Sequence, residues 1–364
     1  MKSILGSNIT LTLFGESHGD KIGAVIDGLC AGIKVDYDFI KECLNQRKPS
    51  IEGETTRIED DDFEIVSGVF NGYTNGNSIC ILMNNTHFDS KSYMKESVRP
   101  SHSDYVSYIR NHGFNDYRGG GQFSGRLTAV IVAAGAIILK ALETLNIEIG
   151  YHIKQCKNVL DRNFNNVIED IKYLNTNKVL VLDDIYEKIK AEINQAKNNN
   201  DSIGGIIQTA ICNLPVGLGE PLFDSLEGKL SNALFSIGGI KGVEFGLGFD
   251  FANKNGSEVN DPFRMDGNSI ITKTNNNGGI NGGMSNGMPV IFNCVIKPTP
   301  SIGKTQETIN INSRTNTTLK IQGKHDSAIV RRVGIVIKCI CALVIADLLV
   351  TRYGTDVFYK GKLD

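Results

Sequence analysis

The chain has 364 residues, of which 41% are hydrophobic and 21% charged, with a formal net charge of −2. This length supports one or two domains with a sizeable core. The balanced charge and the lack of a basic tail argue against a nucleic acid or an acidic membrane surface as partner. Eight scattered cysteines, no Cys-x-x-Cys pair and no leader-like N-terminus predict reduced thiols, no metal site and a cytoplasmic location.

The hydrophobic pattern of the first 145 residues predicts a mixture of strands and helices. Alternating or continuous apolar runs predict strands at 11–14, 22–26, 63–70 and 78–83. Helical spacing predicts helices at 36–45 and 104–111 and a long apolar helix at 127–145.

The same mixture continues to the end of the chain. We expect strands at 147–153, 206–212, 243–249, 289–296 and 319–322, helices at 184–197, 222–235 and 332–351, and a loop at 251–287. The longest apolar run, 333–350, contains Lys338 and Asp347, which favours a buried helix over a bilayer span. Two helices that are apolar on nearly every face need sheets around them, and no proline-rich linker interrupts the chain. The sequence therefore predicts a single α+β domain over residues 1–364.

The stretch 99–128 concentrates polar chemistry ahead of the first long helix. It holds Arg99, His102 and a triple glycine at 119–121, with further arginines beside the glycines. A glycine turn at a helix N-terminus presents free N–H groups at the positive end of the dipole, which suits an anionic ligand. An ordinary tight turn before a core helix is the alternative, and Asp104 can equally be the N-cap of a short helix.

A second histidine lies near the N-terminus, in Gly-Glu-Ser-His-Gly at 15–19. The strand–turn–helix context of a nucleophile elbow is missing, so Ser17 does not read as a nucleophile. His18 is a candidate general acid, and an ordinary core or surface histidine is the alternative.

The last long helix is preceded by further charged residues. Asp326 follows His325 and is a candidate base. Arg331 and Arg332 open the helix, where cations oppose the dipole, so we expect an anionic ligand beside the pair.

Two more segments suit a phosphorylated ligand. Paired glycines at 278–287 can form a backbone cradle, and Lys297, Thr299 and Ser301 can add a cation and hydroxyls. Cations gathered without a metal motif predict a small ligand with several negative groups. A nucleotide-dependent transferase is the weaker reading, because Gly-x-x-x-x-Gly-Lys-Ser/Thr is missing.

These motifs, taken in order, resemble the chorismate synthase family. The resemblance rests on Gly-Glu-Ser-His-Gly (15–19), Val-Ser-Gly-Val-Phe (66–70), Arg-Pro-Ser-His-Ser-Asp (99–104), Arg-Gly-Gly-Gly (118–121), Ile-Lys-Gly-Val-Glu (240–244), the glycine loop, Lys-Pro-Thr-Pro-Ser (297–301) and Gly-Lys-His-Asp (323–326). It implies a β-α-β sandwich built on two central helices, a homotetramer, and a carbon–oxygen lyase of the shikimate pathway. It also implies 5-enolpyruvylshikimate 3-phosphate as substrate, chorismate as product and reduced FMN as cofactor without net redox change.

The resemblance also implies roles for particular residues. His18 matches the acid that protonates the departing phosphate, His102 the group beside reduced flavin, and Asp326 with Ser17 the pair that takes a proton. The substrate anions would be bound by Arg47, Lys48, Arg99, Arg126 and Arg332. The flavin-binding positions are Gln122, Phe123, Ser124, Gly238, Gly239, Gly282, Lys297, Pro298, Thr299, Pro300, Ser301 and Lys324.

The chain departs from the family pattern mainly in the glycine turn. The family has Arg, Ser, Ala and Glu at the positions of Gln122, Phe123, Gly125 and Leu127. A milder change is Ser101, where the family has Gly. These changes motivate one alternative, a non-catalytic homologue that binds flavin or a shikimate phosphate. Some relatives reduce FMN with NADPH, but no nicotinamide motif is seen, so we expect an external reductant.

Overall fold

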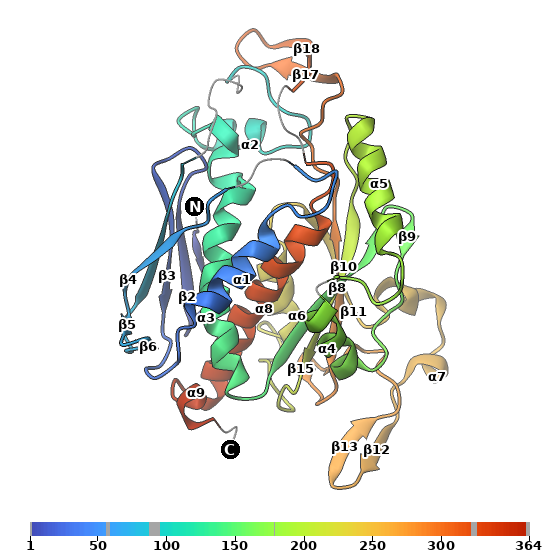
Figure 1. The fold of residues 1–364 in the computed structure, drawn as a ribbon. Helices are drawn as coiled ribbons and strands as arrows, with labels where there is room; N and C mark the ends of the chain where they lie inside the picture. The colour runs from blue at the N-terminus through green and yellow to red at the C-terminus, as the bar shows by residue number, and fades with distance from the viewer. Residues whose placement is uncertain (1, 56–58, 87–94, 178, 322–325, 362–364) are drawn as a thin grey trace.

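Two five-stranded antiparallel sheets enclose a layer of helices (Figure 1). The computed structural model describes residues 2–55, 59–86, 95–177, 179–321 and 326–361. The first sheet has the order β1 (Ile4–Leu5), β2 (Thr10–Gly15), β3 (Lys21–Asp27), β7 (Ile79–Asn84), β4 (Phe63–Ser67). The second has the order β11 (Ile240–Phe245), β16 (Val290–Ile296), β10 (Gly205–Cys212), β8 (Glu148–Cys156), β9 (Val159–Leu160).

The central layer consists of α1 (Tyr37–Arg47), α3 (Thr128–Glu143) and α8 (Val330–Tyr353). Helix α3 packs on β3 and β7 of the first sheet, α8 packs on β8 and β10 of the second, and the two helices pack on each other. A Cβ at Gly135 would lie 2.3 Å from the Cys339 Cβ, so glycine is what lets α3 and α8 approach this closely. The predicted sandwich with long buried central helices is confirmed.

Among the described residues, the segment Gly125–Glu143, which includes α3, and helix α8 are long and apolar enough to cross a bilayer, but 83% and 94% of their apolar windows are buried inside the protein. Asp347, which interrupts the apolar run of α8, is itself buried. Its carboxylate accepts backbone hydrogen bonds from Ser7, Asn8 and Ile9 at 2.6–3.1 Å. The Asp347 carboxylate therefore holds the N-terminal segment against helix α8.

The remaining elements lie around the sandwich. The helices are α2 (Asp104–Arg110), α4 (Val167–Asn177), α5 (Tyr186–Asn198), α6 (Leu226–Leu234), α7 (Gly256–Val259) and α9 (Val357–Lys360). Short 3₁₀ segments span Arg118–Phe123, Gly125–Leu127 and Gly248–Asn253. Two-stranded ribbons pair β5 (Val69–Phe70) with β6 (Tyr73–Thr74), β12 (Phe263–Asp266) with β13 (Ser269–Thr272), β14 (Ile280–Asn281) with β15 (Met284–Ser285), and β17 (Gln306–Asn310) with β18 (Thr315–Leu319).

Several predicted elements differ from the structure. The strand expected at 63–70 breaks into β4 and β5 at Gly68, which has a positive φ of 83°. The loop expected at 251–287 contains α7 and two ribbons, and the strand expected at 319–322 lies earlier, in β18. The helix expected at 222–235 begins only after Ser225, whose side chain caps it, and the strand expected at 243–249 is displaced to β11. Helix α4 and strand β17 were not predicted.

The cysteines agree with the expectation of reduced thiols. All eight are free and seven are buried. Burial raises the pKa of the Cys43 thiol to about 11, so this group stays protonated at neutral pH.

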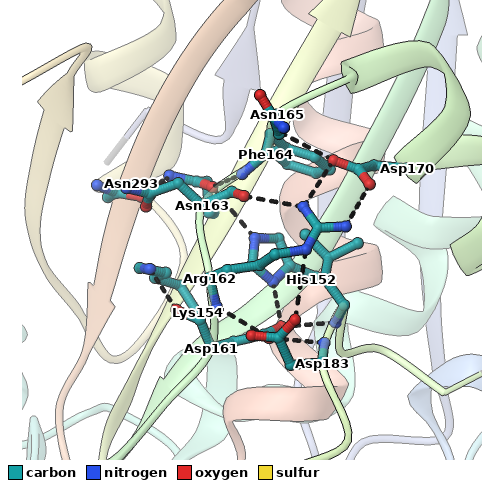
Figure 2. A network of polar contacts seen from close by, with 12 residues as sticks. His152, Lys154, Asp161, Arg162, Asn163, Phe164, Asn165, Asp170, Asp183 and Asn293 are labelled. Atoms are coloured by element: carbon teal, nitrogen blue, oxygen red, sulfur yellow. Dashed lines mark hydrogen bonds and ion pairs between the residues drawn. The ribbon is translucent and has the colours of Figure 1, made fainter.

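A buried polar network joins β8 and β10 to the chain segment before α4 (Figure 2). His152 is fully buried, and its Nδ1 lies 2.9 Å from Asp161 Oδ2. Its Nε2 lies 3.1 Å from Gln208 Oε1, an oxygen that also accepts the N–H of Phe164. Both ring nitrogens thus lie within hydrogen-bond distance of a side-chain oxygen. His152 and Asp161 form a buried hydrogen-bonded pair.

Replacing Asp161 by asparagine should lower the free energy of unfolding at pH 7 by about 1–3 kcal/mol, because an amide cannot accept all the hydrogen bonds that the carboxylate accepts from His152, Leu182 and Asp183. Burial raises the pKa of Asp161, but hydrogen bonds from His152 and from the Leu182 and Asp183 N–H groups outweigh it and hold the pKa below its usual range. The folded pKa is the lower one, so the stabilisation is present above the unfolded value of about 4 and is lost as the pH falls through the folded value.

Urea unfolding of the wild type and D161N at pH 7 and at pH 3 measures this effect. The difference between the two proteins should shrink at pH 3. D183N is the matched control, because Asp183 pairs with the same segment through Arg162 at 3.4 Å but its side chain is half exposed. Equal losses in D161N and D183N would contradict the assignment.

Candidate active site

The triple glycine lies between the two candidate histidines. Gly119, Gly120 and Gly121 all have positive φ, at 59°, 86° and 55°. A Cβ on Gly119 would lie 2.6 Å from His18 Nε2, and one on Gly120 would lie 3.0 Å from His102 Cε1. Only glycine gives the turn both this backbone and this closeness. The structure therefore brings together the two histidines that the sequence singled out.

The sequence analysis expected the glycine turn to lead directly into the central helix, but the structure shows a further segment between them. Helix α3 starts at Thr128, seven residues after Gly121, and the 3₁₀ segment Gly125–Leu127 lies between them. The expectation that the turn delivers the free N–H groups of this helix is therefore wrong. The turn instead places backbone without side chains next to the imidazoles of His18 and His102.

Ser17 and His18 lie in the loop between β2 and β3, where they are 2% and 4% exposed. The Ser17 N–H donates to Gly121 O at 3.1 Å, which fixes the loop to the glycine turn. A Cβ on Gly119 would lie 2.7 Å from Ser17 Oγ. Within the described part of the chain, this buried hydroxyl has no hydrogen-bond partner, so it is available to a ligand.

His102 lies against Gly120 of the same turn and is held by Asp104. His102 Nδ1 is 2.7 Å from Asp104 Oδ1, and Arg99 donates to both oxygens of the same carboxylate at 2.7 Å. The interpretation of Asp104 as an N-cap is wrong, because Ser103 occupies that position and Asp104 is the first residue of α2.

Ser101 lies in the turn that leads to His102, with a positive φ of 57°. This left-handed conformation favours glycine, so the serine at this position strains the backbone. Ser101→Gly should be more stable than Ser101→Ala by about 1 kcal/mol, because only glycine relieves the strain. Chemical denaturation of both variants measures the difference, and equal stability would refute strain at this position.

The segment 297–301 follows β16 of the second sheet and contacts the residues next to His102. Lys297 Nζ donates to Ser101 O at 2.7 Å, and its N–H donates to Gly239 O at 2.9 Å. Burial lowers the pKa of the Lys297 ammonium. Arg99 Nη1 reaches Ser301 Oγ at 3.4 Å. Arg99 therefore connects the histidine segment to this one.

Thr299, in the same segment, contacts Asp326. Thr299 Oγ1 donates to Asp326 O at 2.6 Å, and the Asp326 carboxylate accepts a 2.5 Å ion pair from Arg332. Arg332 Nε is buried and, among the described residues, lacks a hydrogen-bond partner. A ligand oxygen can accept this N–H.

Arg47 and Arg126 meet at one buried carboxylate. Asp61, 6% exposed, accepts from Arg47 Nη1 at 2.9 Å and from Arg126 Nη1. Arg126 also donates to Glu59 at 3.1 Å. Burial lowers the pKa of the Arg47 guanidinium, against Asp61 and Glu59, which raise it. The sequence analysis missed both carboxylates, although the acidic run at 59–62 was a visible signal.

Arg331 and Lys48 have other surroundings. Both Arg331 side-chain nitrogens Nε and Nη2 bind Glu54, at 3.0 and 2.8 Å, and further donors reach the carbonyls of Gln46 and Lys48. The Glu54 carboxylate thus offsets the dipole cost of Arg331, so this cost alone does not call for a ligand at Arg331. Lys48 follows α1 and is half-buried.

The other predicted flavin positions lie on surrounding loops. Gln122 and Ser124 are half-buried after the triple glycine, while Phe123 is 45% exposed. Gly238 and Gly239 follow α6, whereas Gly282 lies in the β14–β15 turn next to Gly283, whose carbonyl accepts the N–H of Leu226 at the start of α6. The described contacts therefore bring Gly239 to Lys297 but do not bring Gly282 there. Lys324 and His325 lie outside the described residues.

The site fits a flavin in two respects. Gly119 and Gly120 carry no side chains, which lets His18, Ser17 and His102 lie against the turn, where their polar atoms can face a ligand. The free hydroxyl of Ser17, the half-buried Lys297 and the hydroxyls of Thr299 and Ser301 offer polar partners around it. Buried His18, the Asp104 carboxylate whose pKa Arg99 and His102 hold below its usual range against burial, and several guanidinium groups can serve acid–base chemistry on an anion.

The comparisons with known proteins agree with this geometry. The sequence model of the chorismate synthase family matches residues 9–350. Chorismate synthase of Dehalococcoides mccartyi is 42% identical over 353 residues, which cover 96% of each chain. That of Pyrococcus abyssi is 42% identical over 349 residues, which cover 95% of this chain and 97% of the relative. A crystal structure of chorismate synthase matches with a TM-score of 0.74 at 25% identity, covering 96% of this chain and 94% of that one.

The sandwich fold and the arginine-lined site define an enzyme that acts on a small anionic molecule. The chain belongs to the chorismate synthase family. Its function is that of a chorismate synthase, a lyase of the shikimate pathway, and the comparisons do not support the alternative of a non-catalytic homologue.

Proposed function

We propose that this chain catalyses the anti-1,4-elimination of phosphate and a proton from 5-enolpyruvylshikimate 3-phosphate, which makes it a carbon–oxygen lyase acting on phosphates. A C–O bond breaks and its electron pair leaves with phosphate. A C–H bond also breaks, its electron pair enters the new double-bond system of chorismate, and no net oxidation occurs. The observation that carries the proposal is the glycine turn, which lies against His18 and His102 with Arg99 beside it.

His18 is the general acid in this proposal. It is 4% exposed and lies against Gly119, so water has little access to its proton. Transfer of that proton to the departing phosphate oxygen makes phosphate a better leaving group.

The arginines bind the substrate, which carries one phosphate and two carboxylates. Arg47, Arg126 and Arg332 are each already ordered by a carboxylate, so little side-chain entropy is lost when the substrate binds. The buried Nε of Arg332 offers a donor for a substrate oxygen. Arg99 and Lys48 complete the set of cations.

Reduced FMN, when bound, supplies electron density to the ring that loses phosphate. It would be held by residues of the glycine turn and of 297–301, with Gly238, Gly239 and Lys324, while the role of Gly282 rests on the family resemblance alone. His102 presents Nε2 to the ligand. Asp326, whose carboxylate pairs with Arg332 at 2.5 Å, is proposed to help take the proton together with Ser17.

The proposal includes the wider setting of the enzyme. The chain works as one catalytic domain over residues 1–364, in the cytoplasm, as a homotetramer, on a small molecule and not on a nucleic acid or a membrane. One buried apolar cluster includes both sheets and the central helices, which supports a single domain. FMN is reduced by an external reductant rather than by NADPH on this chain.

Mixing the protein with the substrate in the absence of oxygen tests this function. With reduced FMN, chorismate and phosphate should form in equal amounts, and the flavin should remain reduced. Oxidised FMN or no flavin should give no product, and oxidised FMN with NADPH should give none either. Binding of both ligands without product would sink the proposal, and product with NADPH would show intrinsic flavin reduction.

A further inference from the structure

Asp104 is shared between the two residues that lead into the glycine turn. Its Oδ1 is 2.7 Å from both His102 Nδ1 and Arg99 Nη2. Its Oδ2 accepts from Arg99 N at 3.0 Å and from Arg99 Nε at 2.7 Å. The three side chains are only 11–17% exposed, so water competes little for these contacts.

The carboxylate of Asp104 is ionised. Burial raises its pKa, but hydrogen bonds from Arg99 and His102 outweigh burial and hold the pKa well below its usual range. An ionised carboxylate only accepts hydrogen bonds, so the proton at 2.7 Å belongs to His102 Nδ1. Arg99 Nη2 at 3.1 Å and Ser103 Oγ at 3.3 Å also approach this nitrogen, and Arg99 Nη2 lies there because it donates to the same Asp104 oxygen.

The other edge of the imidazole faces the glycine turn. A Cβ on Gly120 would lie 3.0 Å from His102 Cε1 and 3.4 Å from Nε2. With the proton of the neutral ring fixed on Nδ1, the nitrogen that gains or gives a proton is Nε2.

We propose that Asp104 is a positioning residue that holds a proton on His102 Nδ1 and thereby directs Nε2 to the ligand over the glycine turn. The inference rests on the proposed function for the identity of that ligand. It does not rest on it for the position of the proton, which follows from the 2.7 Å contact between His102 Nδ1 and the ionised Asp104 carboxylate.

The chain contains a matched carboxylate without a histidine hydrogen bond. Asp170 lies in the first turn of α4, as Asp104 lies in the first turn of α2. It accepts from Arg162 Nη1 and Nη2 at 3.0 and 2.5 Å and from the Asn165 N–H at 2.9 Å (Figure 2). Asp170 is part of the network outside the second sheet. D170N therefore removes a similar arginine partner away from the glycine turn.

D104N tests the proposal. The asparagine oxygen should turn to the Arg99 N and Nε donors, which leaves its NH₂ group facing His102 Nδ1 and reverses the tautomer. ¹⁵N spectra of histidine-labelled protein should show Nδ1 of His102 protonated in the wild type and unprotonated in D104N, with H102A assigning the signal. Turnover should fall on the order of 10²–10⁴-fold, because an incorrectly placed proton removes the acid–base function, while FMN affinity changes less than about tenfold.

A double-mutant cycle separates positioning from structural support. In the H102A background, D104N should cause no further loss of turnover, and D170N should leave turnover unchanged in the wild-type background. An unchanged His102 tautomer in D104N, or an equal D104N loss with and without His102, would overturn the proposal. If the wild type makes no chorismate, the proposed function fails, while the ¹⁵N spectra still decide where the proton lies.

Discussion

Replacing His18 by alanine is expected to lower turnover on the order of 10²–10⁴-fold while leaving the affinity for 5-enolpyruvylshikimate 3-phosphate nearly unchanged. The departing phosphate then loses its proton donor, but the arginines that bind the substrate remain in place. Steady-state rates and equilibrium binding, measured without oxygen and with reduced FMN, separate the two effects.

Two variants sharpen this prediction. His18→Asn keeps a polar side chain against Gly119 but cannot act as an acid at neutral pH, so it should be as inactive as the alanine variant. His112 lies exposed after α2, and H112A should retain full turnover. An active H18A enzyme would show that another group protonates the phosphate.

The second large effect is expected from Gly119→Ala. The added Cβ would lie 2.6 Å from His18 Nε2 and 2.7 Å from Ser17 Oγ, closer than real Cβ contacts. It also has to adopt a φ of 59°, which costs about 1–2 kcal/mol in an L-residue. Either the turn or His18 must move, so turnover should fall at least tenfold in a protein that still folds.

Gly125→Ala is the matched control in the same stretch. Gly125 has no positive φ, and a Cβ there would meet nothing within 4 Å. G125A should therefore keep the stability and turnover of the wild type, measured by thermal unfolding and by chorismate formation. Equal turnover in G119A and G125A would refute the assigned closeness of the glycine turn to His18.

The central helices could be predicted from the sequence because their apolar runs are long and nearly uninterrupted, as in α8. Helix α4 was missed although Val167, Ile171 and Leu174 have the spacing of one buried helix face. Its surrounding residues are polar, and only packing on β8 and β10 shows which face is buried. The hairpins within 251–287 were missed because Asn and Gly favour turns and hide short strands between them.

Some features of the candidate site could likewise be predicted from the sequence, and others could not. His18, His102 and the triple glycine stand out in the sequence because each residue type is chemically distinctive. Their closeness could not be predicted, because it depends on a turn that joins the β2–β3 loop to the segment before α3. The partner of a charged side chain is a property of the tertiary structure, as Asp61 between Arg47 and Arg126 shows.

A crystal structure of the protein with oxidised FMN and 5-enolpyruvylshikimate 3-phosphate tests the central claim most directly, because oxidised flavin should allow binding without turnover. We expect the flavin ring against the turn at 119–121 with His102 Nε2 toward it, and His18 within hydrogen-bond distance of the substrate phosphate. A flavin bound away from this turn, or a phosphate out of reach of His18, would contradict the account.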